Sequence, residues 1–320
     1  QGTLFGRNSV GGAVSLISKK PSGQLGLKQV VSMGRFNELR SVTRLDLPEM
    51  ARVKVKLDYL HSERDGWVDN TAPGQADYNA YNKDGGKLSV NWQPRDEFAV
   101  DYSYDNSSVE MVQEYMQFYK DNLGSFSEER ERLTETRLPV SPLKPMVVEQ
   151  QGHSVAATWV ASDHLTIKSI SAVRNLKEDS QNNYAGVLYF NGLLDLSIME
   201  QDQYSQELQL IGRSKQIDWV AGLYYLKEDV NKFLQDSFSL DIFGIFGAPL
   251  SPIDPPTTFD ALGAGAILPP RIVDAEARSR AAYGQFSWAP NGFDERMELT
   301  VGGRYTEDKK IASRFETSLS

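Results

Sequence analysis

A strict alternation of apolar and polar residues constrains this chain most. Apolar side chains take every second position in four long segments, 53–59, 88–92, 98–104 and 297–305. Because successive side chains of a strand point to opposite faces, each segment predicts a strand with one apolar and one polar face. The runs reach roughly ten residues with Trp or Tyr at their ends, whereas strands of a soluble sandwich have about 5–6 residues. The pattern therefore favours a sheet that spans a bilayer between two aromatic girdles.

The connections between the expected strands carry further information. Each connection after the first two is alternately long and short. A barrel in an outer membrane has short periplasmic turns and long extracellular loops, whereas a soluble meander has no reason to keep this parity. We expect eleven strands, at 24–34, 40–48, 52–64, 84–93, 96–106, 152–161, 164–177, 202–212, 215–229, 280–289 and 295–308, with long loops near 65–83, 107–151, 178–201 and 230–279.

Composition excludes several classes of protein. The net charge of −9 and the pI of about 5.0 argue against a nucleic-acid partner, which favours a basic face. The mean hydropathy is −0.43 and no run of about 18 apolar residues occurs, so no transmembrane helix is expected. This does not exclude membrane-spanning strands, since their second face is polar. Cysteine is absent, which rules out disulfides and thiolate metal sites.

The first residues of the chain differ from the rest. Glycines stand at 2, 6, 11 and 12, a short alternating run covers 13–18, and Lys19-Lys20-Pro21 ends it. Such glycine density indicates tight turns and close approach of the backbone to its surroundings. We expect a small compact element that lies inside a larger structure.

This stretch resembles a known signature. Gly2-Thr3-Leu4-Phe5-Gly6-Arg7-Asn8-Ser9, followed by Gly11-Gly12-Ala13, Ile17 and Lys19-Lys20-Pro21, is similar to the end of the plug domain of TonB-dependent outer-membrane receptors. Residues 204–210 with 219–225, and 282–286 with 299–305, resemble two barrel hairpins of the same family. The long loops show no such resemblance.

The resemblance implies an all-β fold, an antiparallel up-and-down transmembrane barrel around a plug. Residues 1–22 would be the C-terminal end of the plug domain, and residues 23–320 the N-terminal half of the barrel. The family's barrels have roughly 22 strands, so the chain would be a fragment of such a barrel. Its sheet would have two unpaired edges, and we expect that the fragment is not stable by itself. Arg7 and Asn8 are expected in hydrogen bonds between plug and wall. The expected inward polar residues are Lys54, Lys56, Asp58, Asp101, Asp105, Glu207, Gln209 and Arg304.

The resemblance also implies a function. Such receptors import a scarce ligand, most often a ferric siderophore, across the Gram-negative outer membrane. The TonB energy-transducing complex drives import through an N-terminal box outside this chain, and outer-membrane lipid surrounds the barrel. No enzyme activity and no cofactor are expected. Haem, cobalamin or an oligosaccharide are alternative ligands, a passive porin is an alternative transporter, and a soluble all-β domain is the third hypothesis.

Aromatic residues in two of the long loops are candidates for ligand contact. Residues 111–119 place Met111, Tyr115, Phe118 and Tyr119 at helical spacing, and 128–137 also has helical character. An aromatic face at the barrel mouth stacks well on a planar catecholate, haem or sugar ring. Packing of the loops onto the barrel or plug is the alternative explanation. The ligand candidates are Tyr115, Phe118, Tyr119, Phe243 and Phe246.

Other possible sites have ordinary explanations. His61, His153 and His164 are far apart in sequence and show no metal-binding spacing. Ser141-Pro142-Leu143-Lys144 lies between prolines, where no helix presents Ser and Lys together. The loop 65–86 is rich in Asp and Asn, which calcium prefers, but turn chemistry accounts for these residues as well.

Overall fold

The computed structural model describes residues 18–117, 131–136, 140, 143–183, 190–240, 264–267, 269–290 and 297–316. These residues form one antiparallel sheet with irregular connections. The described part of the chain contains no helix long and apolar enough to cross a membrane.

Twelve strands make up this sheet, and most are long. They are β1 (Gly26–Met33), β2 (Leu39–Asp46), β3 (Val53–Arg64), β4 (Tyr81–Arg95), β5 (Phe98–Met111), β6 (Met146–Ser162), β7 (Leu165–Asn183), β8 (Phe190–Arg213), β9 (Ile217–Leu240), β10 (Ala264–Ile267), β11 (Arg271–Trp288) and β12 (Leu299–Glu316).

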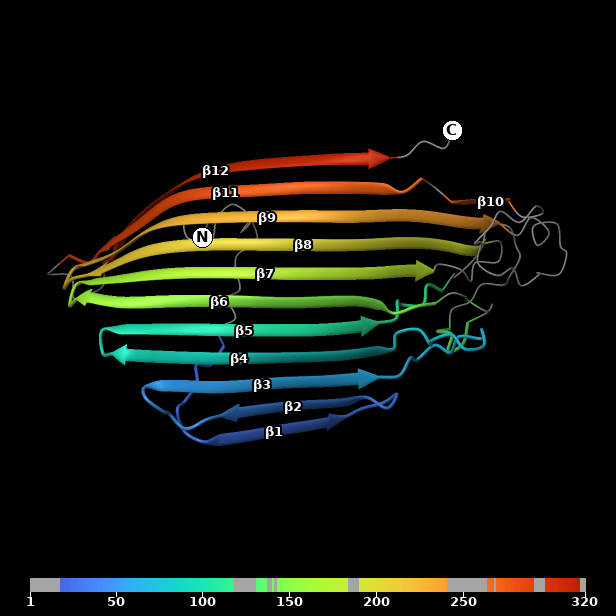
Figure 1. The fold of residues 1–320 in the computed structure, drawn as a ribbon, viewed down its shortest axis with the longest axis horizontal. Coiled ribbons are helices and arrows are strands. Elements are labelled where there is room, and N and C mark those ends of the chain that lie inside the picture. Colours follow the sequence, from blue (N-terminus) through green and yellow to red (C-terminus); the bar gives the residue numbers. More distant parts are fainter. Residues whose placement is uncertain are drawn as a thin grey trace.

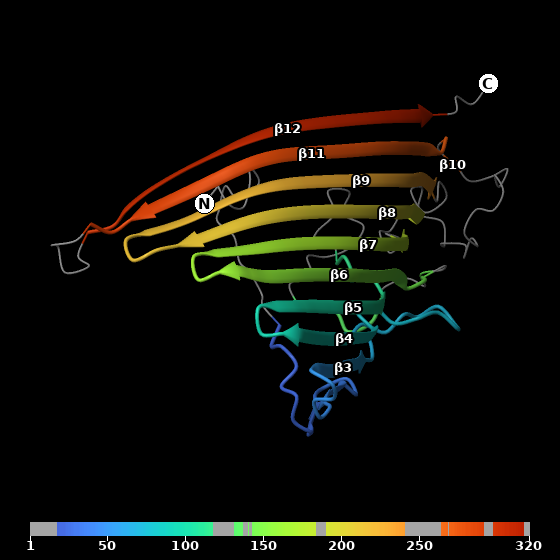
Figure 2. The same cartoon turned by 60° about the vertical axis from the view of Figure 1, so that its left-hand side comes forward.

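Each strand pairs with its neighbour in sequence, as in an up-and-down barrel (Figure 1). The short β10 pairs with the last residues of β9, and β11 pairs with the rest of β9 along the same edge. Among the described residues, β1 pairs only with β2 and β12 only with β11, so the sheet is open. The strands follow one curved, twisted surface (Figure 2). The predicted all-β fold is confirmed.

The connections lie as their lengths predict. The turns that join β2 to β3, β4 to β5, β6 to β7 and β8 to β9 all lie at one end of the sheet, where the end of β11 also pairs with the start of β12 (Figure 1). The strand ends that the long connections join lie at the opposite end, which we call the loop end. We call the other the turn end. The predicted directional asymmetry is confirmed.

The two faces of the sheet have different chemistry. We call the face that contacts residues 18–20 the inner face; its polar residues include Lys56, Lys87 and Asp101. The alternating side chains of the opposite, outer face are apolar over the half nearer the turn end. Exposed large apolar residues there include Leu57, Trp92, Val155, Trp159, Leu208, Leu223, Phe286 and Val301. A face of this kind is suited to lipid.

From β4 onward, apart from the short β10, the strands are longer than the sequence predicts, mainly toward the loop end. The expected loop 178–201 is mostly strand, because β7 and β8 stay paired as far as Asn183 and Leu194. The expected loop 230–279 likewise begins with the end of β9 and contains β10. These extensions lack the apolar–polar alternation of the band; even their buried residues Ser180 and Ser197 are polar, so periodicity did not reveal them.

The helical character expected for 111–119 and 128–137 is wrong where the structure describes these residues. Met111 ends β5 and pairs with Tyr81 and Met146, and 112–117 is irregular. Residues 131–136 are also irregular, with a bridge between Asp69 and Glu135. The pairing of Met111 with β4 and β6 prevents a helix from starting there, so tertiary contacts override the local helical spacing.

The buried apolar core of the described residues lies among the loops. The sheet is a single layer, so its side chains remain partly accessible on both faces. Residues from two connections, the one between β3 and β4 and the one between β5 and β6, pack together at the loop end. Their core consists of Val68, Tyr78, Val112, Val140 and Leu143, with Trp67, Ala76, Ala80 and Tyr115 packed against it.

Candidate functional site

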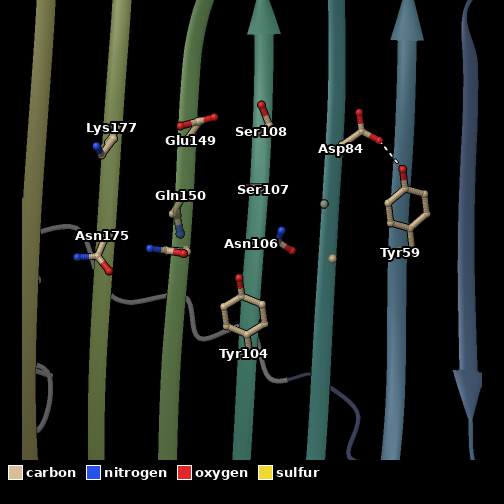
Figure 3. A pocket seen from close by; sticks show the side chains of 13 residues that line it. Tyr59, Asp84, Tyr104, Asn106, Ser107, Ser108, Glu149, Gln150, Asn175 and Lys177 are labelled. Carbon is tan, nitrogen blue, oxygen red and sulfur yellow. Dashed lines mark hydrogen bonds between the residues drawn. The ribbon is translucent and has the colours of Figure 1, made fainter.

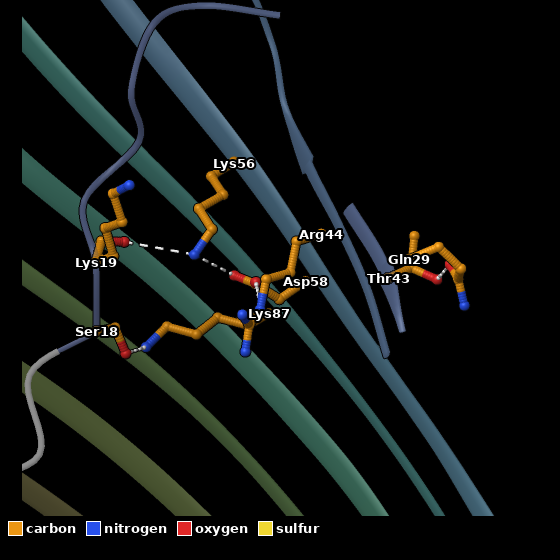
Figure 4. A network of polar contacts seen from close by, with 8 residues as sticks. All are labelled: Ser18, Lys19, Gln29, Thr43, Arg44, Lys56, Asp58 and Lys87. Carbon is orange, nitrogen blue, oxygen red and sulfur yellow. Dashed lines mark hydrogen bonds and ion pairs between the residues drawn. The ribbon is translucent and has the colours of Figure 1, made fainter. Parts of the chain in front are cut away.

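The inner face holds the tail that precedes β1. Lys87 Nζ donates to Ser18 Oγ at 2.9 Å, and Lys56 Nζ donates to the Lys19 carbonyl oxygen at 3.5 Å (Figure 4). Lys20 Nζ lies 2.6 Å from Asp101 Oδ2. Three successive residues of the tail are thus bound by β3, β4 and β5.

Alternation along the strands explains why these side chains meet. Lys56 and Lys87 occupy inward positions of β3 and β4, one register step apart, because Asp58 pairs with Lys87. Lys56 Nζ lies 3.1 Å from Asp58 Oδ2, and Arg44 Nε lies 3.6 Å from Asp58 Oδ1. Asp58 therefore orients two cations around the tail.

A cavity of about 710 Å³ lies between this tail and the first strands. Two carboxylates and five cations line it, which gives a net positive lining in an acidic protein. Clefts lined by one sign of charge concentrate ions of the opposite sign. The charged lining residues are Lys19, Lys28, Arg44, Asp46, Lys56, Asp58 and Lys87.

A second polar cluster lies on the inner face of β8, β9, β11 and β12. Tyr283 Oη donates to Glu207 Oε1 at 2.5 Å and accepts from Gln209 Nε2 at 3.1 Å. The guanidinium of Arg304 lies 5.6 Å from the ring centre of Tyr283. Gly222 leaves room for the Tyr283 ring, because a Cβ there would lie 2.3 Å from Tyr283 Cζ. This part of the wall is polar and rigidly arranged.

A pair of carboxyl groups lies near the loop end of the same wall. Asp195 and Asp236 are register partners on β8 and β9, and Arg271 of β11 forms an ion pair with Asp236. Burial raises the pKa of Asp195, and the hydrogen bond with Asp236 raises it further. Compared with an isolated aspartate, this arrangement favours the protonated form of Asp195.

The loop layer presents aromatic and cationic side chains. The ring centre of Tyr115 lies 5.1 Å from that of Tyr78, in an edge-on contact. Arg64 lies between the rings of Trp67 and Tyr81, with its guanidinium carbon 4.4 and 4.6 Å from their centres. Such stacking stabilises by about 1 kcal/mol per contact when the cation is partly desolvated.

Only one residue of the predicted ligand set falls in the described part of the chain. Tyr115 is half-buried against Tyr78, so its packing and a ligand contact are compatible, and its ligand role stays a prediction. The plug residues Arg7 and Asn8 lie outside the described residues. So do the remaining ligand candidates, Phe118, Tyr119, Phe243 and Phe246.

The Asp- and Asn-rich loop shows turn chemistry. Asn70 Oδ1 accepts from the backbone N–H groups of Ala72 and Val140, and Asn70 Nδ2 donates to the Val140 carbonyl at 2.8 Å. Asp77 Oδ1 accepts from the Asn70 backbone N–H. No group of three carboxylate or histidine side chains suited to a metal ion occurs among the described residues.

The histidines have protein partners. His61 Nδ1 lies 3.0 Å from Asp84 Oδ1, His153 Nδ1 lies 2.9 Å from Tyr102 Oη, and His164 Nδ1 lies 3.1 Å from the Arg213 carbonyl. They belong to separate surroundings, as their spacing predicts.

Several residues of the site were not found from the sequence. The carboxyl pair of Asp195 and Asp236 and the stacked Arg64 depend on register and loop packing. Sequence periodicity shows the face on which a residue lies, but not its neighbour on the next strand. The basic stretch around Lys19 and Lys20 was a usable signal, since a cation beside inward-facing Asp side chains of the strands can form an ion pair, as Lys20 does with Asp101.

The curved open sheet with one polar and one apolar face is similar to known structures. No protein-family model matches the sequence, and a search of curated proteins returns no match. Among solved structures, the ferric yersiniabactin uptake receptor FyuA from Yersinia pestis is 18% identical, with a TM-score of 0.74. The chain has the fold of a siderophore-receptor barrel. That match covers 100% of this chain and 44% of the receptor.

Other siderophore-receptor structures agree. The siderophore receptor PiuA from Acinetobacter baumannii is 13% identical with a TM-score of 0.64, and the match covers 98% of this chain and 50% of PiuA. The unliganded ferric citrate transporter FecA is 9% identical with a TM-score of 0.59, and the match covers 99% of this chain and 44% of FecA. This chain therefore spans half or less of the length of these receptors. At these identities the similarity establishes the siderophore-receptor barrel fold.

Proposed function

We propose that this chain is part of a TonB-dependent receptor that imports a ferric siderophore across the outer membrane of a Gram-negative bacterium. One observation carries the proposal: the polar inner face grips the tail at 18–20, while the opposite face is apolar. A plugged barrel in lipid requires this arrangement. The siderophore-receptor fold adds independent support.

The domain assignment follows the same reasoning. Residues 1–22 form the end of the plug, and residues 23–320 form the first half of the barrel, with the loop end outside the cell. Arg7 and Asn8 contribute further plug–wall hydrogen bonds. The tail contacts of Lys56, Lys87 and Asp101 support this assignment, because they join the wall to the last residues of the plug segment.

The ligand binds at the loop end. Tyr115 together with Phe118, Tyr119, Phe243 and Phe246 forms an aromatic rim. The half-buried position of Tyr115 beside Tyr78 supports this role, because a ring held by its neighbour loses little freedom on binding. No chemical step is needed, so the protein acts as a transporter and not as an enzyme.

The charge of the inner wall favours an anionic ligand. The basic cavity beside Lys56 and Lys87 attracts a negatively charged chelate toward the turn end. Many ferric siderophores are anionic, whereas cobalamin and neutral oligosaccharides gain nothing from such a cavity. A ferric chelate is therefore favoured over these alternatives.

The proposal is tested with the full-length protein in cells that lack other iron receptors. Accumulation of a panel of ⁵⁵Fe-labelled siderophores is measured with and without an uncoupler, beside radiolabelled haem and cobalamin. We expect uptake of an anionic chelate that stops when the proton-motive force is removed, while binding to the cells persists. Replacing Tyr115 with Ala should weaken binding about tenfold, and replacing Met116 with Ala should not.

A passive porin is the alternative that the same experiment separates. Its transport follows the concentration gradient and survives the uncoupler. Uptake of small solutes without energy, together with no retained binding of any ferric chelate, would contradict the receptor proposal.

A further inference from the structure

A hollow of about 410 Å³ lies on the sheet over β3 to β7, nearer the loop end than the apolar band (Figure 3). Its side chains come mainly from outward positions on neighbouring strands. Tyr59, Gly86, Asn106, Gln151 and Asn175 follow one another across the register of five strands. The hollow is therefore built from the regular part of the sheet and not from loops.

Gly86 forms the floor of the hollow. A Cβ at this position would lie 2.8 Å from Asn106 Oδ1, so any larger residue would displace the Asn106 side chain. The rings of Tyr59 and Tyr104 lie on either side of this floor (Figure 3). The site thus combines an open floor with two aromatic walls.

The lining offers hydrogen bonds, and its charged residues are the carboxylates of Asp84 and Glu149 and the cation of Lys177. Asp84 Oδ1 accepts from Tyr59 Oη at 2.6 Å and lies 3.0 Å from His61 Nδ1. Lys177 Nζ lies 3.1 Å from Glu200 Oε1, so the cation of the hollow already has a counter-ion. Phosphate recognition favours unpaired cations or clustered backbone N–H groups, and this hollow offers no unpaired cation among its described residues.

Three of its polar side chains remain available. Asn106, Ser108 and Gln151 make no hydrogen bond to another described residue, although each lines the hollow. Amide and hydroxyl groups that donate and accept, placed beside tyrosine rings, are suited to the hydroxyl groups and apolar ring faces of a sugar.

The position of the hollow beside the apolar band indicates which kind of molecule carries the sugar. Leu57 and Trp92 lie on the outer face toward the turn end, exposed by 42% and 45%. Outward tyrosines mark the border of this apolar band, since Tyr104 of β5, Tyr204 of β8 and Tyr225 of β9 lie on the same face within one register step of one another. Aromatic girdles mark the level of lipid headgroups.

We propose that this hollow binds the sugar headgroup of a membrane glycolipid through its hydroxyl groups. The proposal rests on the membrane location given under the proposed function, and it adds a site on the lipid-facing side of the wall. The acyl chains of the lipid lie along the apolar band below, and the headgroup occupies the floor above Gly86.

The test uses native mass spectrometry of the full-length protein in detergent. Three lipids are added: an acylated glucosamine disaccharide without phosphate, its bis-phosphorylated form, and phosphatidylethanolamine. We expect both sugar lipids to bind with similar affinity and phosphatidylethanolamine to bind much more weakly. The double variant Asn106→Ala with Asn175→Ala should bind the sugar lipids about tenfold more weakly, since two hydrogen bonds are lost.

Asn231→Ala is the matched control. Asn231 Nδ2 donates to Asp274 Oδ1 at 2.6 Å, as Asn175 Nδ2 donates to Asp202 Oδ1, but Asn231 lies outside the hollow. Its affinity for glycolipid should not change. Equal binding of phosphatidylethanolamine, binding of the phosphorylated form alone, or full affinity in the double variant would overturn the proposal. Loss of iron uptake with intact glycolipid binding would contradict only the proposed function.

Discussion

Lys87 Nζ of β4 lies 2.9 Å from Ser18 Oγ, 69 positions earlier in the chain. This contact joins the wall of the sheet to the segment that enters it. With the neighbouring contacts of Lys56 and Lys20, it fixes which face of the sheet is the interior. The side of the sheet that faces lipid and the side that faces the ligand path both follow from this assignment of the inner face.

The tail contacts should differ in strength according to their burial. The Lys56 side chain is 10% exposed, whereas the Lys20 side chain is 69% exposed. We expect Lys56→Met to lower the free energy of unfolding by about 2 kcal/mol, because Asp58 loses a partly buried partner. Lys20→Met should cost less than about 1 kcal/mol. Urea unfolding of the full-length protein in lipid vesicles measures both, and equal effects would contradict this ranking.

The turn between β2 and β3 carries strain that a substitution should relieve. Ala51 and Arg52 have φ of 50° and 62°, and the Met50 and Val53 backbones exchange hydrogen bonds of 2.8 and 3.0 Å around them. Such two-residue turns favour Asn or Gly. We expect Ala51→Asn to stabilise the protein by about 0.5–1 kcal/mol. Asp163→Asn, in a turn without positive φ, is the control, and a loss of stability in Ala51→Asn would refute this explanation.

Tyr78 should tolerate loss of its hydroxyl group but not of its ring. The residue is 1% exposed, and its Oη has no hydrogen-bond partner among the described residues. Burial raises the pKa of the phenol well above its ordinary value, so the group stays neutral. We expect Tyr78→Phe to be neutral or slightly stabilising, and Tyr78→Ala to cost about 3–5 kcal/mol. Thermal unfolding of the two variants gives the comparison, and a large loss in Tyr78→Phe would reveal a missing partner.

The pair of Asp195 and Asp236 should make the loop end sensitive to pH. Burial and the neighbouring carboxyl raise the pKa of Asp195, which lies beyond the membrane-spanning part of β8. The folded state therefore holds this proton more tightly than the unfolded chain, whose pKa is about 3.9. The resulting stabilisation is complete below that value and is lost as the pH rises through the raised pKa.

Hydrogen exchange of the loop ends of β8 and β9, corrected for intrinsic rates, measures this effect. Protection should fall between acidic and neutral pH in the natural protein. In Asp195→Asn it should change much less, because the titrating group is gone. Identical pH profiles of the two proteins would show that the carboxyl pair does not control these strand ends.

Much of the fold was predictable because alternation and connection length are local properties. Leu57 and Trp92 identify the lipid-facing side, and Lys56 and Asp58 the opposite one, without knowledge of strand partners. Register is different: the meeting of Asp195 with Asp236, or of Tyr59 with Asp84, depends on cross-strand alignment that the sequence does not display. The helical spacing around Tyr115 predicted a helix that does not form, because Met111 pairs with Tyr81 of β4 instead. This strand pairing, like register, is not visible in the local sequence.

We expect the loop end of the sheet to face the outside of the cell and the turn end the periplasm, and cysteine labelling distinguishes the two ends. The chain contains no cysteine, so each single substitution adds one thiol within it, and the unsubstituted full-length protein gives the labelling background. In intact cells that make the full-length protein, a membrane-impermeant maleimide should label Pro73→Cys at the loop end. It should leave Asp163→Cys and Lys215→Cys at the turn end unlabelled until the outer membrane is permeabilised. Labelling of the turn-end cysteines in intact cells, or of all three positions alike, would contradict the account.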